Sequence, residues 1–94
     1  MATYHLTTIQ ILDKVRFLKY AQEARPLLER YGGEYLAMGR ASGSLEGDPL
    51  SEPIVLTRWE NTQQLKDFWG SSEYKRLRKL RDGAVVVNST ILES

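Results

Sequence analysis

The sequence predicts one α+β domain over residues 1–94, in which a four-stranded antiparallel sheet carries its helices on one face. Three observations lead to this prediction. The length suits a single domain with a modest core, because a chain this short buries only about two-thirds of its unfolded surface. Segments rich in β-branched and aromatic residues alternate with segments whose apolar residues recur at helical spacing. These segments follow one another in the order β-α-β-β-α-β.

A strand and a helix open the chain. Residues 3–12, TYHLTTIQIL, are rich in β-branched and aromatic side chains and therefore predict a strand. Asp13 can cap the helix that follows, since its carboxylate can accept a hydrogen bond from the free N–H groups of a first helical turn. The apolar residues that recur there at helical spacing are Phe17, Tyr20, Ala21, Ala24, Leu27, Leu28 and Tyr31.

Two features should shape this helix. Pro26 lies inside the helical pattern and has no N–H to donate, so we expect a kink or a short break near Arg25. Gly32 and Gly33 should end the helix, because glycine tolerates the left-handed conformation that commonly follows a helix C-terminus.

Two strands joined by a loop come next. Residues 34–40, EYLAMGR, and residues 54–60, IVLTRWE, predict the second and third strands. The intervening residues 41–53 are rich in Gly, Ser and Pro, which predicts a loop or an irregular hairpin.

The second helix is expected in two segments. Asn61 can cap the first segment, and Gln64 three residues later resembles the partner residue of a capping box. Residues 70–73, GSSE, interrupt the helix, and a second segment should run to about Asp82. Residues 84–93 predict the last strand. This element order is that of the ferredoxin-like fold.

Two of the predicted strands lack the alternation of apolar and polar residues that is expected when only one face of a sheet is covered. Residues 54–56 (IVL) and 85–87 (VVV) are consecutive apolar runs. The chain has no spare helix for the second face, so a second copy of the chain is the simplest cover, through a large two-fold contact. Alternatively, these runs reflect only central positions in the sheet.

Composition excludes several kinds of protein and site. The chain has no cysteine, which rules out disulfide bonds, thiolate nucleophiles and Cys-based metal sites and fits a reducing cytoplasm. No apolar run approaches the ~20 residues of a membrane span, and the N-terminus lacks a signal-peptide pattern. A single histidine without metal-ligand spacing predicts no metal, and we expect no cofactor.

The basic run at residues 75–81, KRLRKLR, raises the question of nucleic-acid binding. The net charge of the chain is only +1, and the third strand lacks the aromatic and glycine pattern of an RNA-binding sheet. Tyr74, Leu77 and Leu80 recur every three residues and should face the sheet. We therefore expect a solvated outer face rather than a nucleic-acid site, formed by Lys75, Arg76, Arg78 and Lys79.

Three short motifs carry a resemblance to a known family. They are YGG at residues 31–33, EGD at residues 46–48 and SSEY at residues 71–74. Their order and spacing resemble the bacterial domain-of-unknown-function family 1330, within the dimeric α+β barrel superfamily. The resemblance covers nearly the whole chain and implies a homodimer in which two sheets pack face to face into a barrel.

The resemblance implies no particular activity. Relatives in the wider superfamily include cofactor-independent monooxygenases of aromatic polyketides, muconolactone isomerases and haem-handling enzymes, and a shared fold does not fix function. Thr8 and Arg58 also stand where members of the family often carry acidic residues. Any chemistry that depends on those acids is therefore not implied for this chain.

His5 is the candidate proton-transfer residue. It is the only histidine, and an imidazole is the one side chain whose ordinary pKa lies near neutrality. Strand parity puts His5 and Thr7 on one face of the first strand, and Thr57 and Trp59 on one face of the third. The resemblance implies that both faces look toward the helices, where a pocket could form. The alternative is a partly exposed histidine bonded to a backbone carbonyl.

Arg58 should lie on the opposite, barrel-facing side of the sheet. A buried arginine needs a partner, which could be a carboxylate of the other subunit or an anionic ligand. The candidate ligand-binding residues are therefore Thr7, Thr57, Arg58, Trp59, Trp69 and Tyr74.

These observations lead to a functional hypothesis. We expect a cytoplasmic homodimer that binds a small hydrophobic or aromatic molecule, with cofactor-independent oxygenation or isomerisation as the expected chemistry of an enzyme of this kind. The alternative is a non-catalytic interaction protein with a filled core. A pocket of ~300 Å³ or more that His5 reaches would favour ligand binding.

Overall fold

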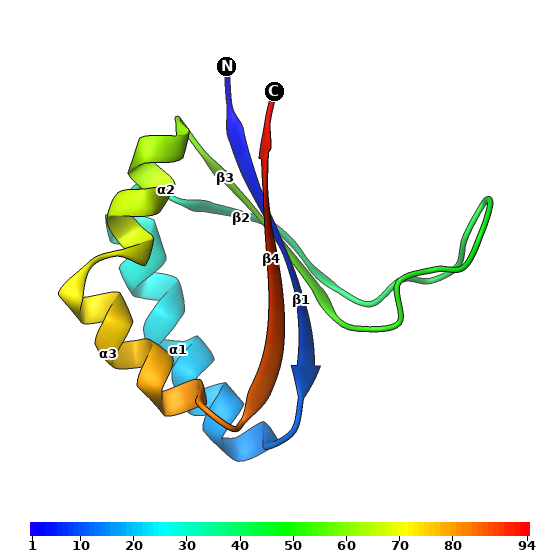
Figure 1. The fold of residues 1–94 in the computed structure, drawn as a ribbon, viewed down its shortest axis with the longest axis horizontal. Coiled ribbons are helices and arrows are strands. Elements are labelled where there is room, and N and C mark those ends of the chain that lie inside the picture. Colours follow the sequence, from blue (N-terminus) through cyan, green and yellow to red (C-terminus); the bar gives the residue numbers. More distant parts are fainter.

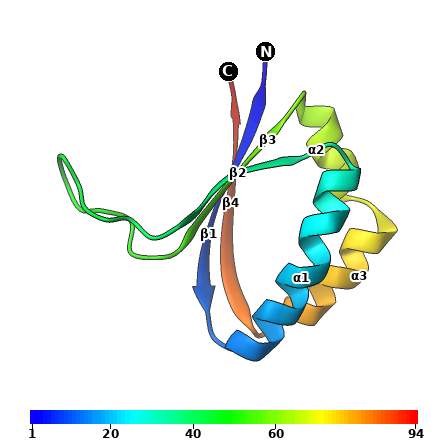
Figure 2. The same ribbon diagram turned by 180° about the vertical axis from the view of Figure 1, so that it is seen from behind.

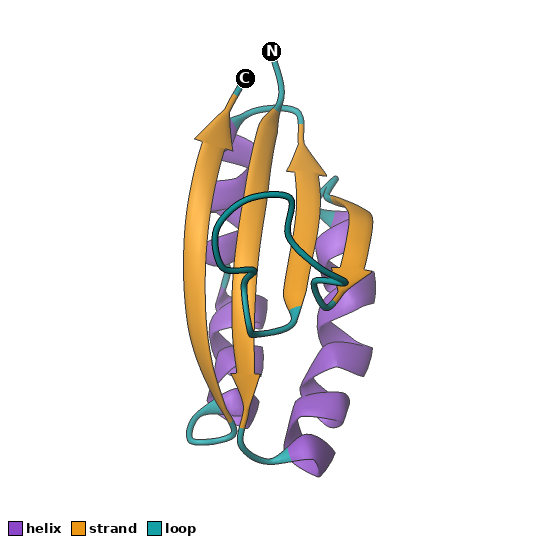
Figure 3. Cartoon of the chain, turned by 90° about the vertical axis from the view of Figure 1, so that its right-hand side faces the viewer, coloured by secondary structure: helices purple, strands orange, loops and turns teal.

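The computed structural model describes residues 1–94, and the element order agrees with the one expected from the sequence. The four strands form one antiparallel sheet in the order β2-β3-β1-β4, and all three helices cover the same face (Figures 1 and 3). This confirms the ferredoxin-like α+β fold. The elements are β1 (Thr3–Ile11), α1 (Lys14–Arg30), β2 (Glu34–Gly39), β3 (Ile54–Trp59), α2 (Thr62–Trp69), α3 (Ser72–Arg81) and β4 (Val85–Glu93).

The strand register decides which side chains face the helices. His5 of β1 lies opposite Thr57 of β3, and Thr7 lies opposite Ser89 of β4. Side chains alternate between the two faces along a strand, so these four residues share the helix side of the sheet. The parity expected from the sequence for His5, Thr7 and Thr57 is therefore present in the structure.

A β-bulge in β2 brings two further side chains to the helix side. The register with β3 shifts between Tyr35 and Ala37, so that Tyr35 lies opposite Thr57 and Met38 opposite Val55. Residues three positions apart in a regular strand would point to opposite faces, but the extra residue of the bulge removes that difference. Tyr35 and Met38 consequently both face α1.

Helix α1 is continuous through Pro26, so of the two expected effects, a kink or a short break near Arg25, the break does not occur. Proline removes only one backbone hydrogen bond, and the apolar residues on either side hold the helix against the sheet. Ala24, Leu27 and Leu28 are buried there. Asp13 caps the helix as predicted, because its carboxylate accepts a hydrogen bond from the Arg16 N–H at 3.2 Å.

The two glycines after α1 have different roles. Gly32 has a φ of +93°, a conformation that suits glycine at the end of a helix. Gly33 is required by space instead, since a Cβ placed there would lie 2.6 Å from a Leu28 methyl and 2.7 Å from the Trp59 ring. The motif YGG thus ends α1 and lets β2 pass close to Trp59.

Helix α2 is capped by Asn61, as predicted, and helix α3 by Ser71. The side chain of Asn61 accepts a hydrogen bond from Gln64 N–H at 2.8 Å, and that of Ser71 accepts from Tyr74 N–H at 3.1 Å. Gln64 completes a variant of the capping box, because its side-chain oxygen accepts from Glu60 N–H rather than from Asn61. No helix combines the length and hydropathy needed to cross a membrane.

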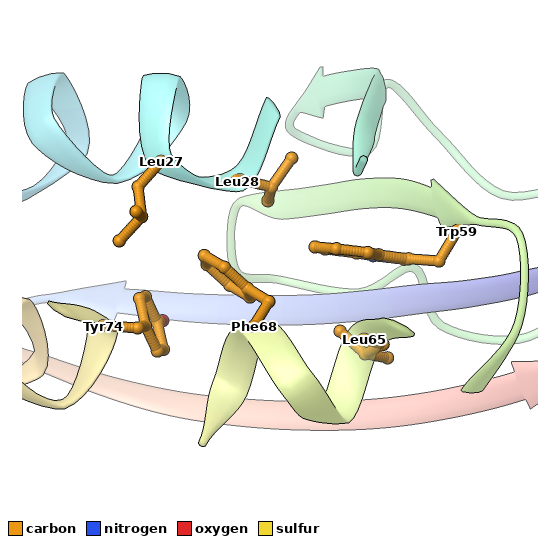
Figure 4. Packing of buried hydrophobic residues seen from close by; sticks show 6 residues of the cluster. All are labelled: Leu27, Leu28, Trp59, Leu65, Phe68 and Tyr74. Carbon is orange, nitrogen blue, oxygen red and sulfur yellow. The ribbon is translucent and has the colours of Figure 1, made fainter. Parts of the chain in front are cut away.

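The core lies between the sheet and the helices, and half of its six central residues are aromatic (Figure 4). Phe68 of α2 is central, with ring centroids 4.4 Å from Tyr74 and 5.3 Å from Trp59. Such aromatic pairs stabilise a core by about 0.5–1.5 kcal/mol each beyond the burial of their surface. The six residues of this buried cluster are Leu27, Leu28, Trp59, Leu65, Phe68 and Tyr74.

The opposite face of the sheet carries no helix (Figure 3). By alternation Leu6, Leu56, Val86 and Leu92 lie on this face, and Val86 and Leu92 are 49% and 60% exposed. The loop between β2 and β3, residues 40–53, projects away from the body on the same side (Figures 1 and 2). We call this surface the open face of the sheet.

Candidate functional site

A small cavity lies between the helix side of the sheet and helices α1, α2 and α3. Its volume is about 80 Å³, and most of its lining residues are hydrophobic. It reaches the sheet at β1, β3 and β4 and is closed above by side chains of all three helices. The polar side chains that line it, apart from three tyrosines, are His5, Thr7, Thr57, Arg81 and Ser89.

An open groove adjoins this cavity beside β4 and α2. Its volume is about 390 Å³, and it shares His5, Trp69 and Ser89 with the cavity. Lys66 of α2 also lines the groove, so one positive charge stands at its wall. The cavity alone is smaller than the ~300 Å³ typical of small-molecule sites, whereas the groove exceeds that size. His5 reaches both.

His5 is held in place by a hydroxyl group and an indole ring. Its Nε2 lies 3.0 Å from Ser89 Oγ and 3.4 Å from Thr7 Oγ1. The edge of the ring meets Trp69 at a centroid distance of 5.6 Å, and only 9% of the residue is exposed. Its hydrogen-bond partners are hydroxyl groups, so the alternative of a histidine bonded to a backbone carbonyl is not what the structure contains.

The surroundings of His5 favour its neutral form. Burial lowers the pKa of His5 below the ordinary value of 6.5, and the positive charge of Arg81 lowers it further. A neutral imidazole can accept a proton at pH 7, which is the state that a general base requires.

Two tyrosines close the cavity from the helices. The hydroxyl groups of Tyr20 on α1 and Tyr74 on α3 share a hydrogen bond of 2.6 Å. Burial is the main cause that raises the pKa of Tyr20, and the neighbouring Tyr74 adds to it. Tyr20 therefore stays protonated at neutral pH and serves the site as a hydrogen-bonding group and an apolar wall.

Arg81 was not among the residues expected to form the site, yet it lines the cavity. Its guanidinium carbon lies 5.5 Å from the ring centroid of Tyr20 and 5.9 Å from that of Trp69. The sequence spacing could have indicated this position. Arg81 follows Tyr74 by seven residues, and residues seven apart in a helix lie on the same face. Residues 75–81 contain so many basic residues that Arg81 was not distinguished from the exposed ones.

Arg78 also departs from the expectation of an outer position. It is half-buried, with its guanidinium carbon 4.9 Å from the ring centroid of Trp69 and 5.5 Å from that of Tyr74. The aliphatic stem and flat cation of arginine pack well against aromatic rings, which explains its inward turn. Lys75, Arg76 and Lys79 are exposed, as predicted.

Five of the seven residues expected to form the site lie together around the cavity. Trp59 is one of the two that do not. It is 1% exposed and packs in the core, where its indole N–H donates to Thr57 Oγ1 at 3.0 Å. Trp59 does not line the cavity, because Phe68 and Leu28 occupy the space around it. The five that line the cavity are His5, Thr7, Thr57, Trp69 and Tyr74.

Arg58 lies away from the cavity, on the open face of the sheet. It is about half exposed, and its guanidinium group lies 3.9 Å from the Glu34 carboxylate on the neighbouring strand β2. Within the chain, Glu34 is therefore its acidic neighbour. An exposed pair at this distance contributes at most about 1 kcal/mol to stability.

No three His, Asp or Glu side chains come together in a way that could hold a metal ion. The cavity and the groove have no carboxylate among their lining residues. The chemistry available at the site is therefore that of one imidazole, hydroxyl groups, aromatic rings and the cations Arg81 and Lys66.

Solved structures with this fold include proteins with different assignments. A protein of unknown function from Rhodopseudomonas palustris, RPA0582, has a TM-score of 0.81 at 16% identity, and the match covers 99% of this chain and 82% of that one. SnoaB, a cofactor-independent oxygenase from Streptomyces nogalater, has a TM-score of 0.73 at 5% identity, with 99% and 92% covered. A candidate antibiotic biosynthesis monooxygenase from Bordetella bronchiseptica has a TM-score of 0.69 at 21% identity, with 99% and 96% covered.

These identities are low, so the likeness establishes a shared fold and no more. No curated protein matches the sequence. The sequence itself gives a more direct relation, because residues 2–94 match the profile of the family described as Domain of unknown function (DUF1330). The match spans nearly the whole chain and includes all three motifs noted above. This protein belongs to the DUF1330 family.

Proposed function

We propose that this protein binds a small aromatic or hydrophobic molecule at the His5 site. The observation that supports this most is the position of His5, where the small cavity meets the larger open groove. Trp69 and Tyr74 offer aromatic surface beside it, and Thr7 and Ser89 offer hydroxyl groups. Small-molecule sites generally combine a mostly apolar wall with a few polar groups that fix orientation.

We further propose that His5 accepts a proton from the bound molecule. Its lowered pKa supports this role, because the neutral imidazole is the proton-accepting form. Removal of a proton from an activated carbon starts two reactions that need no cofactor. Return of the proton to another carbon is an isomerisation. Reaction with dioxygen can convert a CH₂ group to a carbonyl, with one oxygen atom retained and the other released as water.

The fold of SnoaB, named as a cofactor-independent oxygenase, supports the second reaction by analogy only. At 5% identity the two chains share an architecture rather than a set of residues. The proposal therefore depends on the His5 site itself.

Titration with 4-methylphenol, a neutral single-ring probe, tests the binding proposal. In two-dimensional NMR we expect the signals of His5, Trp69 and Ser89 to shift together as the probe binds. His5→Ala should weaken binding about threefold to tenfold, the range for loss of one neutral hydrogen bond and its contacts. Thr8→Ala is the matched control, because Thr8 lies on the same strand, three residues after His5, and its side chain faces the open side of the sheet.

Equal affinity in the wild type and His5→Ala would contradict the role of His5 in binding. Shifts spread over the open face instead of the His5 site would contradict the placement of the ligand. Absence of any saturable shift would favour the non-catalytic interaction protein, for which the small volume of the cavity is the supporting observation.

We also propose that two copies of the chain associate through the open face of the sheet. The apolar residues Leu6, Leu56, Val86 and Leu92 on this face support the proposal, since large exposed apolar patches are unusual on a monomer. The loop of residues 40–53 projects on the same side and is placed to extend along a partner (Figure 2).

A further inference from the structure

Arg81 is a half-buried cation that contacts aromatic rings but has no hydrogen-bond or ion-pair partner in the protein. Its Nε is buried and makes no hydrogen bond. None of the three ion pairs in the structure includes Arg81, and its guanidinium group donates to no carbonyl. An unpaired buried donor is costly, because it has lost its hydrogen bonds to water without replacement. Such a group is a candidate for binding a ligand.

Of the eight arginines, Arg76, Arg78 and Arg81 make no ion pair or hydrogen bond, and of these three only Arg81 lines the cavity. Arg25, Arg30 and Arg58 each pair with a glutamate. Arg16 donates to the backbone carbonyls of Leu80 and Asp82, at 3.1 and 2.6 Å, and Arg40 donates to a carbonyl in its own loop. Arg81, in contrast, turns into a cavity whose lining includes no carboxylate.

The charged side chains that line the cavity and the groove are all basic. The chain carries 12 acidic residues, yet none lines the cavity or the groove. Arg81 stands at the cavity and Lys66 at the groove, with His5 between the two spaces. Opposite charge must come from outside the protein if this region is to be neutralised, and a low-dielectric wall strengthens the attraction for an anion.

We infer that the ligand of this site is an aromatic carboxylate whose carboxyl group binds the Arg81 guanidinium. This inference rests on the proposed binding function and names the chemical class of its ligand. Arginine presents its N–H groups in a planar fork that matches the two oxygens of a carboxylate. The ring centroids of Tyr20 and Trp69 lie 5.5 and 5.9 Å from the guanidinium carbon, and both rings pack against it. The cavity of about 80 Å³ suits a carboxyl group with part of one ring, and the remainder of the ligand extends past Trp69 into the groove.

The inference has a consequence for His5. The charge of Arg81 is one cause of the lowered His5 pKa, so an anion bound to Arg81 opposes that effect. Binding of a carboxylate should therefore raise the His5 pKa, whereas binding of a neutral ligand of the same shape should not. The groups that face His5 are Arg81 of α3, Lys66 of α2, Tyr20 of α1 and the hydroxyls of Thr7 and Ser89 on the sheet.

Benzoate and benzamide form a matched pair of probes, because they have nearly the same shape and differ in charge. With wild-type protein we expect benzoate to bind about tenfold more tightly than benzamide, as measured by NMR titration of the His5 and Trp69 signals. Arg81→Gln should remove this preference by weakening benzoate alone. Arg76→Gln is the control, since it removes an exposed charge from the same helix and should keep the preference.

Arg81→Lys gives a second variant that retains the charge and lacks the planar fork, and it should show an intermediate preference. Equal affinity of wild-type protein for benzoate and benzamide would overturn the inference and leave the proposed binding function standing. Loss of the preference in Arg76→Gln as well would also overturn it, by showing a general charge effect. Failure of both probes and of 4-methylphenol to bind would overturn the binding function together with the inference.

Discussion

At the scale of single residues, His5 reports on its own surroundings. It is the only histidine, so every imidazole ring signal belongs to this one residue, and its pH dependence can be followed by NMR. The residue is buried beside Trp69 and lies in the field of Arg81. Both effects act against the imidazolium form, and they can be separated because only one of them depends on charge.

We predict that the His5 midpoint in wild-type protein lies below 6.5 and that Arg81→Gln raises it without restoring the full value. Burial remains in the variant and continues to lower the pKa, whereas the charge is gone. Arg76→Gln should leave the midpoint unchanged. A midpoint at or above 6.5 in the wild type would contradict the buried, cationic surroundings described here.

The same shift predicts how stability depends on pH. The unfolded chain binds a proton at His5 more readily than the folded chain, because the folded pKa is lowered. The stability associated with neutral His5 is therefore complete above pH 6.5 and decreases as the pH falls toward the folded midpoint. In His5→Asn the free energy of unfolding should depend less on pH over this range. Urea denaturation between pH 5 and pH 7, roughly the range of histidine titration, measures the difference.

At the scale of the elements, close contact of α1, β2 and β3 depends on a glycine. Gly33→Ala would place a methyl group within 2.7 Å of Leu28 and Trp59. We predict a loss of about 1–3 kcal/mol in the free energy of unfolding, the usual range for overpacking a tight core. Gly39→Ala is the control, because a Cβ there meets no atom within 4 Å. A loss of equal size in both variants would show that backbone conformation, rather than space, determines the effect.

The elements were the part of the molecule most open to prediction from sequence. Asp13, Asn61 and Ser71 all cap helices, because these short polar side chains act on backbone groups only three residues away. The continuity of α1 through Pro26 was not predictable from local sequence. It depends on burial of residues on both sides of the proline against the sheet, which is a tertiary effect.

The candidate site was predictable in part for a similar reason. Parity along a strand put His5, Thr7 and Thr57 on one face without knowledge of the helices. The positions of the Trp59 and Arg81 side chains depend instead on how the core side chains divide the space between the sheet and the helices. Trp59 packs against Leu28 and Phe68, and the cavity that remains lies beside Arg81. This arrangement depends on side-chain volumes, which the spacing of residues along the chain does not predict.

At the scale of the whole molecule, the sheet has one covered face and one open face (Figure 3). Val86 is 49% exposed at the open face, so a lysine there can reach water in a monomer and need not disturb folding. In the proposed dimer the same lysine would be buried between two sheets, where an unpaired charge is costly.

We predict that the wild type sediments as a dimer at micromolar concentration and that Val86→Lys sediments as a folded monomer. Val15→Lys is the matched control, since Val15 is 79% exposed on α1, away from the open face. Circular dichroism checks that each variant is folded. A wild type that sediments as a monomer would contradict the dimer, and so would a Val86→Lys variant that remains dimeric.

The pairing of β1 with β4 has a mechanical consequence. The two strands are antiparallel, and the chain begins and ends at the same end of their ladder, where Ser94 N–H donates to the Ala2 carbonyl at 3.0 Å (Figure 1). A force that separates the two termini would unzip the ladder one hydrogen bond at a time instead of shearing all of them at once. His5 lies opposite Ile91 in the third residue pair from this end. Tension on the ends would therefore reach the wall of the His5 site before it disturbed the helices.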